Sequence, residues 1–283
     1  MTISTFFLGR VLPLTPVQII SITSEDLHHE KDQLVDWQRP RQFWRSTSIT
    51  EDQEIIINLG PIPTLYAGLY MRGMNFQQVM IEANDRNEWT SPLHSTTVTL
   101  ETDPLVERKH LLHLFRGTPA RAKTQVISSS RTALRINNQY IRLLISQEQN
   151  LNTDDRDNYR INVLSLVSSG LAVDVRASIN LTVQTPRIVS ESGLGHSDIT
   201  TVGERILTMN LPWDWLWDQQ PGAAINEEED MLDLSPDSHV PVIVCRDINQ
   251  LSRAYLVRRV GDIQINSSQG VGASMPLAYT EVG

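Results

Sequence analysis

Cysteine is almost absent from this chain: Cys245 is the only one in 283 residues. A single thiol excludes an internal disulfide and a cluster of thiolate metal ligands, so the fold does not depend on an oxidising compartment. Long hydrophobic runs are also missing, because no stretch approaches the roughly 18 to 20 apolar residues of a membrane-spanning helix. Residues 1–10 lack the basic start and apolar stretch of a secretory signal. These absences predict a soluble protein made in the cytoplasm, without membrane insertion.

Basic residues are scarce relative to acidic ones. The chain has 24 Lys and Arg against 33 Asp and Glu, which gives a formal net charge of -9. This is the wrong sign for a general nucleic-acid binder, so no nucleic-acid partner is expected. Hydrophobic residues make up 40% and charged residues 20%, which is typical of a globular protein. The length allows one large or two ordinary domains with a sizeable core.

Motifs for catalysis or cofactor binding are missing as well. The sequence contains no G-x-S-x-G motif, P-loop or dinucleotide fingerprint, so we expect neither an enzyme nor a bound cofactor. His110 and His113 occur in HLLH without a third ligand nearby, which favours a structural role over a zinc site. Cys245 lies in an apolar strand and is interpreted as an inert buried thiol. Two other clusters of possible metal ligands are interpreted as surface residues. They are His28-His29-Glu30, and Asp154, Asp155 and Asp157.

Period-2 alternation and many β-branched residues predict an all-β protein. Turn residues separate the strands at short intervals. Strands are expected at residues 17–22, 54–59, 65–71, 78–83, 95–100, 111–115, 140–146, 159–168, 179–185, 205–210, 240–245, 254–262 and 274–282.

Only two stretches carry helical signals. Residues 24–37 predict one short peripheral helix capped by Ser24, with Leu27, Leu34 and Val35 on one face. The other stretch is 211–219, reading LPWDWLWDQ. Its early proline suits a first helical turn, while its alternating tryptophans suit a strand, and both readings stay open.

Tryptophans supply the candidate contact residues. Trp37, Trp44 and Trp89 lie beside strand-forming residues, which favours core or core-edge packing over a carbohydrate platform. Among these three, Trp89 is the candidate for stacking on a glycan. The candidates for partner contact are Trp213, Trp215 and Trp217, because aromatic residues are enriched in interface cores. Burial inside their own part of the chain is the alternative.

One polar segment near the C-terminal third is expected to be a mobile loop. Residues 222–238 contain the acidic run Asn226-Glu-Glu-Glu-Asp230 between Pro and Gly. We expect 226–234 to be disordered in the free protein or ordered by a partner, because its carboxylates repel one another.

A family resemblance rests on an ordered set of motifs. Trp44-Arg-Ser-Thr-Ser48 is followed by Glu54-Ile-Ile-Ile-Asn-Leu-Gly60, then Leu65-Tyr-Ala-Gly-Leu-Tyr70, then Gly73-Met-Asn75 and Ile81. This order resembles the discoidin-like (galactose-binding-like) jelly-roll modules of tailed-phage tail and baseplate structural proteins. Residues 140–145 and 159–166 resemble the paired closing strands of that module. Motifs at 240–247, 259–263 and 276–282 resemble the smaller β domain that follows it.

The resemblance implies two units and a core. The first is a discoidin-like β-sandwich at 1–176, and the second a smaller β-rich C-terminal domain at 177–283. The residues expected in the core are Ile55, Ile57, Leu59, Leu65, Leu69, Ile141, Leu143, Ile145, Ile161, Val163 and Leu166.

For function, the resemblance implies a virion structural protein of a tailed bacteriophage, assembled in the host cytoplasm. It would be a tail or baseplate scaffold that contacts other tail proteins in several copies around an axis and anchors a fibre. The alternative is a carbohydrate-binding adhesion module that recognises a host-surface glycan. Fold alone does not decide between them.

Overall fold

The structure is a computed structural model. It describes residues 4–37, 39, 42–100, 109–117, 131–132, 134–149, 157–175, 180–184, 187–191, 197–201, 206–216, 241–245, 247, 250–262, 266–268 and 272–282. Four predictions lie outside these residues: the acidic loop at 222–238 with its segment 226–234, Trp217, Asp154 and Asp155.

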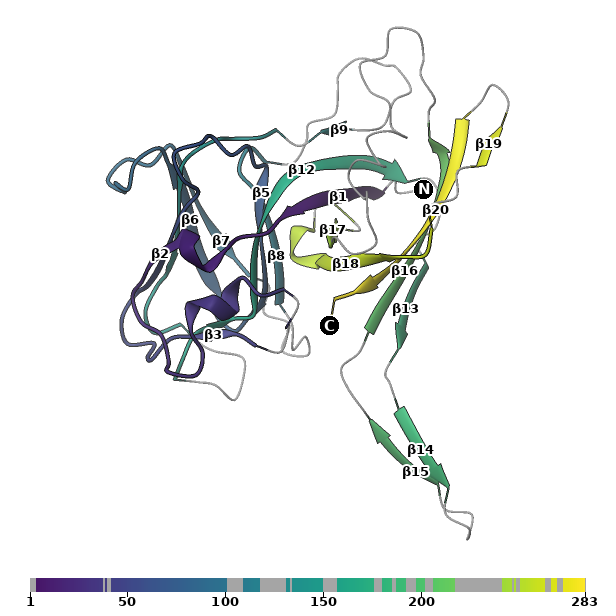
Figure 1. Cartoon of the computed structure of the whole chain (residues 1–283), viewed down its shortest axis with the longest axis horizontal. Coiled ribbons are helices and arrows are strands. Elements are labelled where there is room, and N and C mark those ends of the chain that lie inside the picture. Colours follow the sequence, from purple (N-terminus) through teal and green to yellow (C-terminus); the bar gives the residue numbers. More distant parts are fainter. Residues whose placement is uncertain are drawn as a thin grey trace, which may run out of the picture.

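The chain is all-β, as its alternating pattern predicted (Figure 1). Within the described ranges there is no α-helix. Three short 3-10 turns occur: η1 (Pro16–Gln18), η2 (Lys31–Leu34) and η3 (Leu251–Arg253).

One layer of the sandwich is a five-stranded antiparallel sheet in the order β2-β4-β10-β6-β7. Its strands are β2 (Ile19–Ile22), β4 (Gln53–Asn58), β10 (Tyr140–Ile145), β6 (Gln78–Asn84) and β7 (His94–Thr99). Alternating residues of the central strand β10 are buried, so one face of this sheet is turned to the core and the other is more open.

The opposite layer belongs to a longer antiparallel sheet in the order β13-β16-β20-β18-β17-β1-β12-β5-β8. At the sandwich it presents β12 (Val163–Val175), β5 (Gly68–Met74) and β8 (Lys109–Leu114). The remaining members are β1 (Ser4–Leu12), β17 (Val242–Cys245), β18 (Ala254–Val260), β20 (Gly272–Glu281), β16 (Ile206–Leu216) and β13 (Asn180–Gln184), with β9 (Arg131–Thr132) paired to β12 and β19 (Asn266–Ser268) paired to β20.

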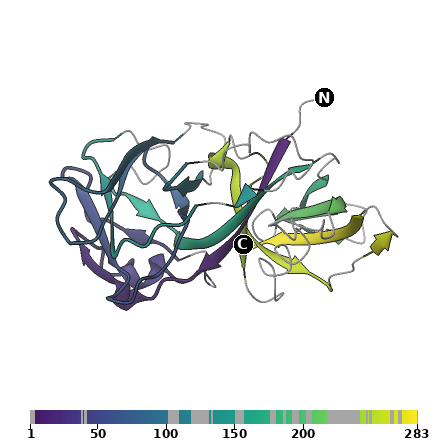
Figure 2. The same ribbon diagram turned by 90° about the horizontal axis from the view of Figure 1, so that it is seen from above.

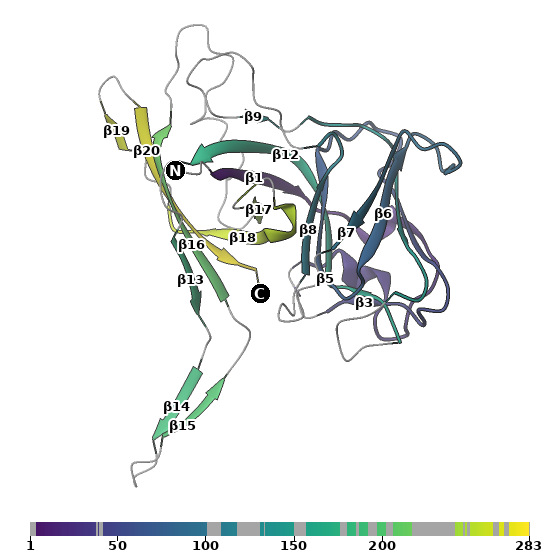
Figure 3. The same cartoon turned by 180° about the vertical axis from the view of Figure 1, so that it is seen from behind.

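Two small pairs stand outside these sheets. β3 (Trp44–Arg45) pairs with β11 (Arg160–Ile161) at one end of the sandwich. β14 (Arg187–Glu191) pairs with β15 (Ser197–Thr201) to form a two-stranded ribbon. Figures 1 and 3 show this ribbon, here called the arm, projecting away from the rest of the molecule.

The residues predicted to be buried are buried with one exception, and all of these buried residues lie in the sandwich core apart from Val163, which packs in a second core. Ile55, Ile57 and Ile141 of the five-stranded sheet are fully buried against residues of the opposite layer such as Leu69. Leu65 was predicted to be buried as well, but it is 48% exposed. The reason is that β5 begins only at Gly68, so Leu65 lies in the preceding connection. Its neighbour Tyr66 is the residue that turns into the core.

A second apolar core lies on the other side of β5. All seven residues of this strand are buried, because both of its faces are covered. The sheet curls so that β18 and η3 contact β8. Phe7 of β1 packs there with Ile243 and Leu256, and its ring fills the space that a side chain at Gly170 would need.

The second core joins the two halves of the chain. β1, at the start, pairs with β12 on one side and with β17 on the other. Figure 2 shows these strands between the sandwich and the C-terminal sheet. The sheet therefore contains strands from both 1–176 and 177–283, and the division of the chain into these two domains stays a prediction.

The helix predicted for 24–37 is wrong. The segment forms only the four-residue turn η2, and Leu27 is exposed instead of sharing a buried face. Ser24 does not cap a helix, since its hydroxyl donates to Gln53 Oε1 at 2.7 Å. Polar side chains tie this segment to the sandwich, and these contacts replace the local bonds of a helix.

Residues 211–216 belong to strand β16, which decides between the two readings left open for them. Pro212 stands opposite Pro276 of β20, beyond the part of β16 that pairs with β13. A proline without an amide hydrogen fits this stretch because, among the described strands, only β20 pairs with β16 there. Trp213 stands opposite Met275, and Trp215 lies within the irregular stretch that follows.

Candidate functional site

The site with the richest side-chain chemistry lies on the open face of the five-stranded sheet, beside the β6–β7 loop. We call it the Trp89 corner, formed by Trp89, Arg142, Glu54 and Glu82. The Arg142 guanidinium carbon lies 4.9 Å from the centre of the Trp89 ring, a cation–π contact. Trp89 is half-buried, so part of its indole faces solvent. The ring of Trp89, the candidate for stacking on a glycan, is therefore held against the Arg142 guanidinium.

Carboxylates from both neighbouring strands hold Arg142 in place. Arg142 Nε donates to Glu82 Oε2 at 2.6 Å, and one terminal nitrogen donates to Glu54 Oε2 at 3.1 Å. Ser95 of β7 donates its hydroxyl hydrogen to Glu82 Oε1 at 3.1 Å. With two carboxylates against one guanidinium the cluster carries one net negative charge. It combines an aromatic face with hydrogen-bonding groups in fixed geometry.

Short hydrogen bonds order the β6–β7 loop itself. Asn84 Nδ2 donates to Glu88 O at 2.6 Å, and Trp89 Nε1 donates to Asn87 Oδ1 at 3.0 Å. Asn138 Nδ2 donates to Asp85 Oδ1 at 2.8 Å and so fastens the loop to the chain before β10. The Trp89 corner is therefore built before any ligand arrives, which lowers the entropic cost of binding.

Next to the corner, aromatic rings close this end of the sandwich. Phe115 makes edge contacts with Tyr66, His94 and His113. Tyr66 donates its hydroxyl hydrogen to Asn138 O at 3.1 Å, and burial raises the pKa of this phenol. Burial, followed by the charge of His94, lowers the pKa of His113 to about 4.

Acidification is expected to weaken the fold through His113. An unfolded histidine has a pKa of about 6.5, so between pH 6.5 and 4 the unfolded chain binds a proton that folded His113 does not. Stability is full above pH 6.5 and falls as the pH drops toward 4, by on the order of 3 kcal/mol from this group. Denaturant unfolding of His113→Gln at pH 7 and pH 4.5 should show a smaller loss than the parent chain.

The control for that experiment is His28→Gln, since His28 is exposed. This variant should keep the parent chain's full pH dependence. Equal flattening in both variants would contradict the assignment to His113.

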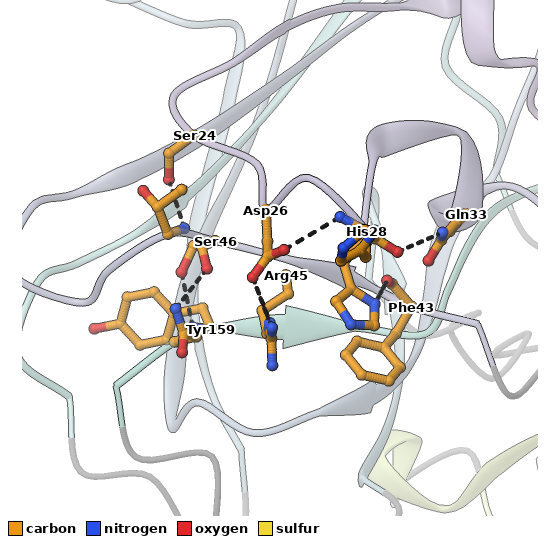
Figure 4. A network of polar contacts seen from close by, with 11 residues as sticks. Ser24, Asp26, His28, Gln33, Phe43, Arg45, Ser46 and Tyr159 are labelled. Atoms are coloured by element: carbon orange, nitrogen blue, oxygen red, sulfur yellow. Dashed lines mark hydrogen bonds and ion pairs between the residues drawn. The ribbon is translucent and has the colours of Figure 1, made fainter.

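The opposite end of the sandwich holds a polar network that explains the WRSTS motif (Figure 4). Trp44 is fully buried in the core, and its Nε1 donates to Ser24 O at 3.2 Å. Arg45 pairs with Asp26 at 2.6 Å, and this hydrogen bond lowers the pKa of the Asp26 carboxyl. Ser46 is buried, and its hydroxyl accepts from the Tyr159 backbone N–H at 2.8 Å. The motif that carried the resemblance thus holds the fold together.

The histidines considered as zinc ligands contact aromatic side chains of the fold instead of other metal ligands. His110 is buried, lies 3.0 Å through Nδ1 from the Tyr70 hydroxyl and packs against Tyr255. His29 stacks on Phe43 and contacts its carbonyl oxygen. Among the residues that the structure describes, no group of three or more His, Cys, Asp or Glu side chains is placed to hold a metal ion. Asp157, the described member of the aspartate group, is exposed.

Other singled-out residues are placed as follows. Cys245 is buried, and burial raises the pKa of its thiol to about 12, which makes it unreactive at neutral pH. Trp37 packs against the second core, with the Arg258 guanidinium carbon 5.0 Å from its ring centre. The backbones of Trp213 and Trp215 lie in β16 and are not brought to the Trp89 corner (Figure 1).

No helix in the described part of the chain is long and apolar enough to cross a membrane.

The fold defines an all-β protein whose first part is a jelly-roll sandwich, with five strands packed against three and a smaller β-rich part continuing the second sheet.

Two solved structures are similar to the chain at low sequence identity. One match is to a chain in a crystal structure of reduced XRCC1 bound to the DNA pol beta catalytic domain, with 13% identity and a TM-score of 0.37; it covers 56% of this chain and 99% of that one. The other is chitosan-binding module 1 from a chitosanase/glucanase of Paenibacillus sp. IK-5, with 14% identity and a TM-score of 0.33; it covers 52% of this chain and 91% of that one. No family model and no curated protein matches the chain.

Proposed function

We propose that the chain is a structural protein of a tailed-phage virion, a tail or baseplate scaffold that works through contacts with other proteins. The observation that carries the scaffold role is the arm, whose strands pair only with each other within the described part of the chain. The phage context comes from the motif order around Trp44 and Ile57.

The arm supports a contact role on physical grounds. A single two-stranded ribbon is at best marginally stable in water, because it has too little surface to bury. Figures 1 and 3 show it extending away from the body that would otherwise cover it. A partner that packs against the ribbon would supply the missing contacts.

Particle composition tests this proposal. Mass spectrometry of purified virions should find the protein at a fixed stoichiometry. Replacing residues 187–201 by a short Gly/Ser linker should abolish its incorporation while leaving the isolated protein folded. Its absence from particles, or normal incorporation of the armless variant, would overturn the scaffold role.

Glycan binding is a second candidate, and the Trp89 corner is the observation that favours it. An indole fixed by Arg142, beside the Glu54 and Glu82 carboxylates, offers a sugar both a stacking face and hydrogen-bonding groups. The corner lies on the sandwich and the arm projects from the other part of the chain, so one protein has room for both roles.

A glycan array probed with the isolated protein tests this second candidate. Trp89→Ala should weaken any binding by more than about tenfold, or 1.4 kcal/mol. Leu93→Ala changes an exposed residue of the same loop and should leave binding intact. No binding on the array, or equal loss in both variants, would exclude the Trp89 corner as the site.

A further inference from the structure

The open strand edges of this fold differ in how well they are protected. Edge strands invite pairing with other chains and are usually blunted by bulges, short length, charge or a covering element. β2 is short and has an irregular register against β4, and β8 has a register shift against β5 and contacts η3 and β18. The edge strands β7 and β13 remain, and β7 is the longer of the two.

β7 has the features of a strand that accepts a partner. It pairs with β6 over six residues without a register shift, and it is the last strand of the five-stranded sheet in the described structure. Its sequence HSTTVT contains no Lys, Arg, Asp, Glu or Pro. Ser95, Thr96, Thr97 and Thr99 are exposed. A regular, uncharged and exposed edge offers its backbone groups to another strand.

The arm has strand edges that no other described strand pairs with. It is a five-residue ribbon with two outer edges, close in length to β7. The arm has a net charge of -1, from Arg187, Glu191 and Asp198. β7 contains no acidic residue that would repel it. The arm points away from the sandwich of its own chain (Figure 3), so a β7 edge that pairs with it would have to belong to another copy.

We propose that the arm of one copy of this chain adds to the β7 edge of a second copy and extends its five-stranded sheet. This inference rests on the proposed scaffold role and names the partner. Each copy gives one arm and receives one, which is a head-to-tail contact that closes into a ring or continues as a filament. A single added strand buries far less than the about 1,200 Å² of a stable interface, so each contact is weak alone and assembly depends on many contacts acting together.

Cross-linking between singly labelled variants tests the pairing in the full chain. One preparation carries Thr97→Cys on β7, and the other carries Thr200→Cys on β15 or Ile188→Cys on β14. Mixed and treated with a short bismaleimide, they should give a covalent dimer of one copy of each. Cys245 is buried and should react little with the bismaleimide. The parent chain, treated in the same way, measures this background.

Two control positions make the result specific. Thr50→Cys places an exposed thiol before β4, and Thr182→Cys places one on the other open edge, β13. The dimer yield with Thr97→Cys should exceed both several-fold. Equal yields, or a yield greatest at Thr182→Cys, would overturn the assignment of β7.

Failure of this inference is distinct from failure of the scaffold role. If no cross-link to β7 forms but the armless variant is excluded from particles, the arm binds a different protein and the scaffold role stands. If the armless variant enters particles normally, the scaffold role itself falls.

Discussion

Aspartate in place of Ile57 is expected to leave the sandwich unfolded. Ile57 is fully buried in β4, between Ile19 of β2 and Ile141 of β10. An unpaired carboxylate buried there costs several kcal/mol, against a total stability of about 5–15 kcal/mol for a typical domain. Near-UV circular dichroism should lose its folded signal, and the cooperative thermal transition should disappear.

Ile62→Asp is the matched control for that substitution. Ile62 lies only five residues further along but is 79% exposed, so the same change should leave the thermal midpoint nearly unaltered. A cooperative transition near the parent midpoint for Ile57→Asp would contradict the described core.

Arg72→Ala is expected to destabilise the junction between the sandwich and the C-terminal strand. The Arg72 side chain is 2% exposed and lies 3.5 Å from Glu281 Oε1, and it also donates to Val282 O. Removing one partner of a buried pair leaves the other charge in a poorly solvated place, at a cost of about 3–5 kcal/mol. Denaturant unfolding would measure this loss, and limited proteolysis should cut the C-terminal strands sooner.

The comparison variant is Arg45→Ala. Arg45 also pairs with one carboxylate, that of Asp26, but both side chains are about a quarter exposed. An ion pair so open to water contributes about 1 kcal/mol or less. Equal losses in the two variants would show that the burial of Arg72 does not matter.

The strands of the sandwich could be predicted because their burial is one-sided. Alternating residues such as Ile141, Leu143 and Ile145 face the core while their neighbours face outward, and that alternation is visible in the sequence. β1 was missed for the opposite reason. Phe7 and Leu8 are adjacent and both fully buried, because β1 lies in a sheet that is covered on both sides there. A run of this kind does not alternate.

Of the candidate site, the sequence indicated Trp89 but not its partners. Glu54, Glu82 and Arg142 come from three strands, and only the sheet register brings them together. No spacing in the sequence predicts that register. The helix expected at 24–37 failed because Asp26 and Ser24 bind Arg45 and Gln53, residues distant in sequence that local capping rules do not consider.

The position of β1 has a consequence for the order in which the chain folds during synthesis. β1 leaves the ribosome before both of its partner strands: Phe7 stands opposite Ala172 of β12 and Cys245 of β17, which are made much later. The five-stranded sheet is complete once β10 has emerged, while β1 must still wait for both neighbours. Pairings between such distant segments close slowly. Until β12 and β17 have been made, the apolar strand β1 therefore lacks both of the strands with which it pairs.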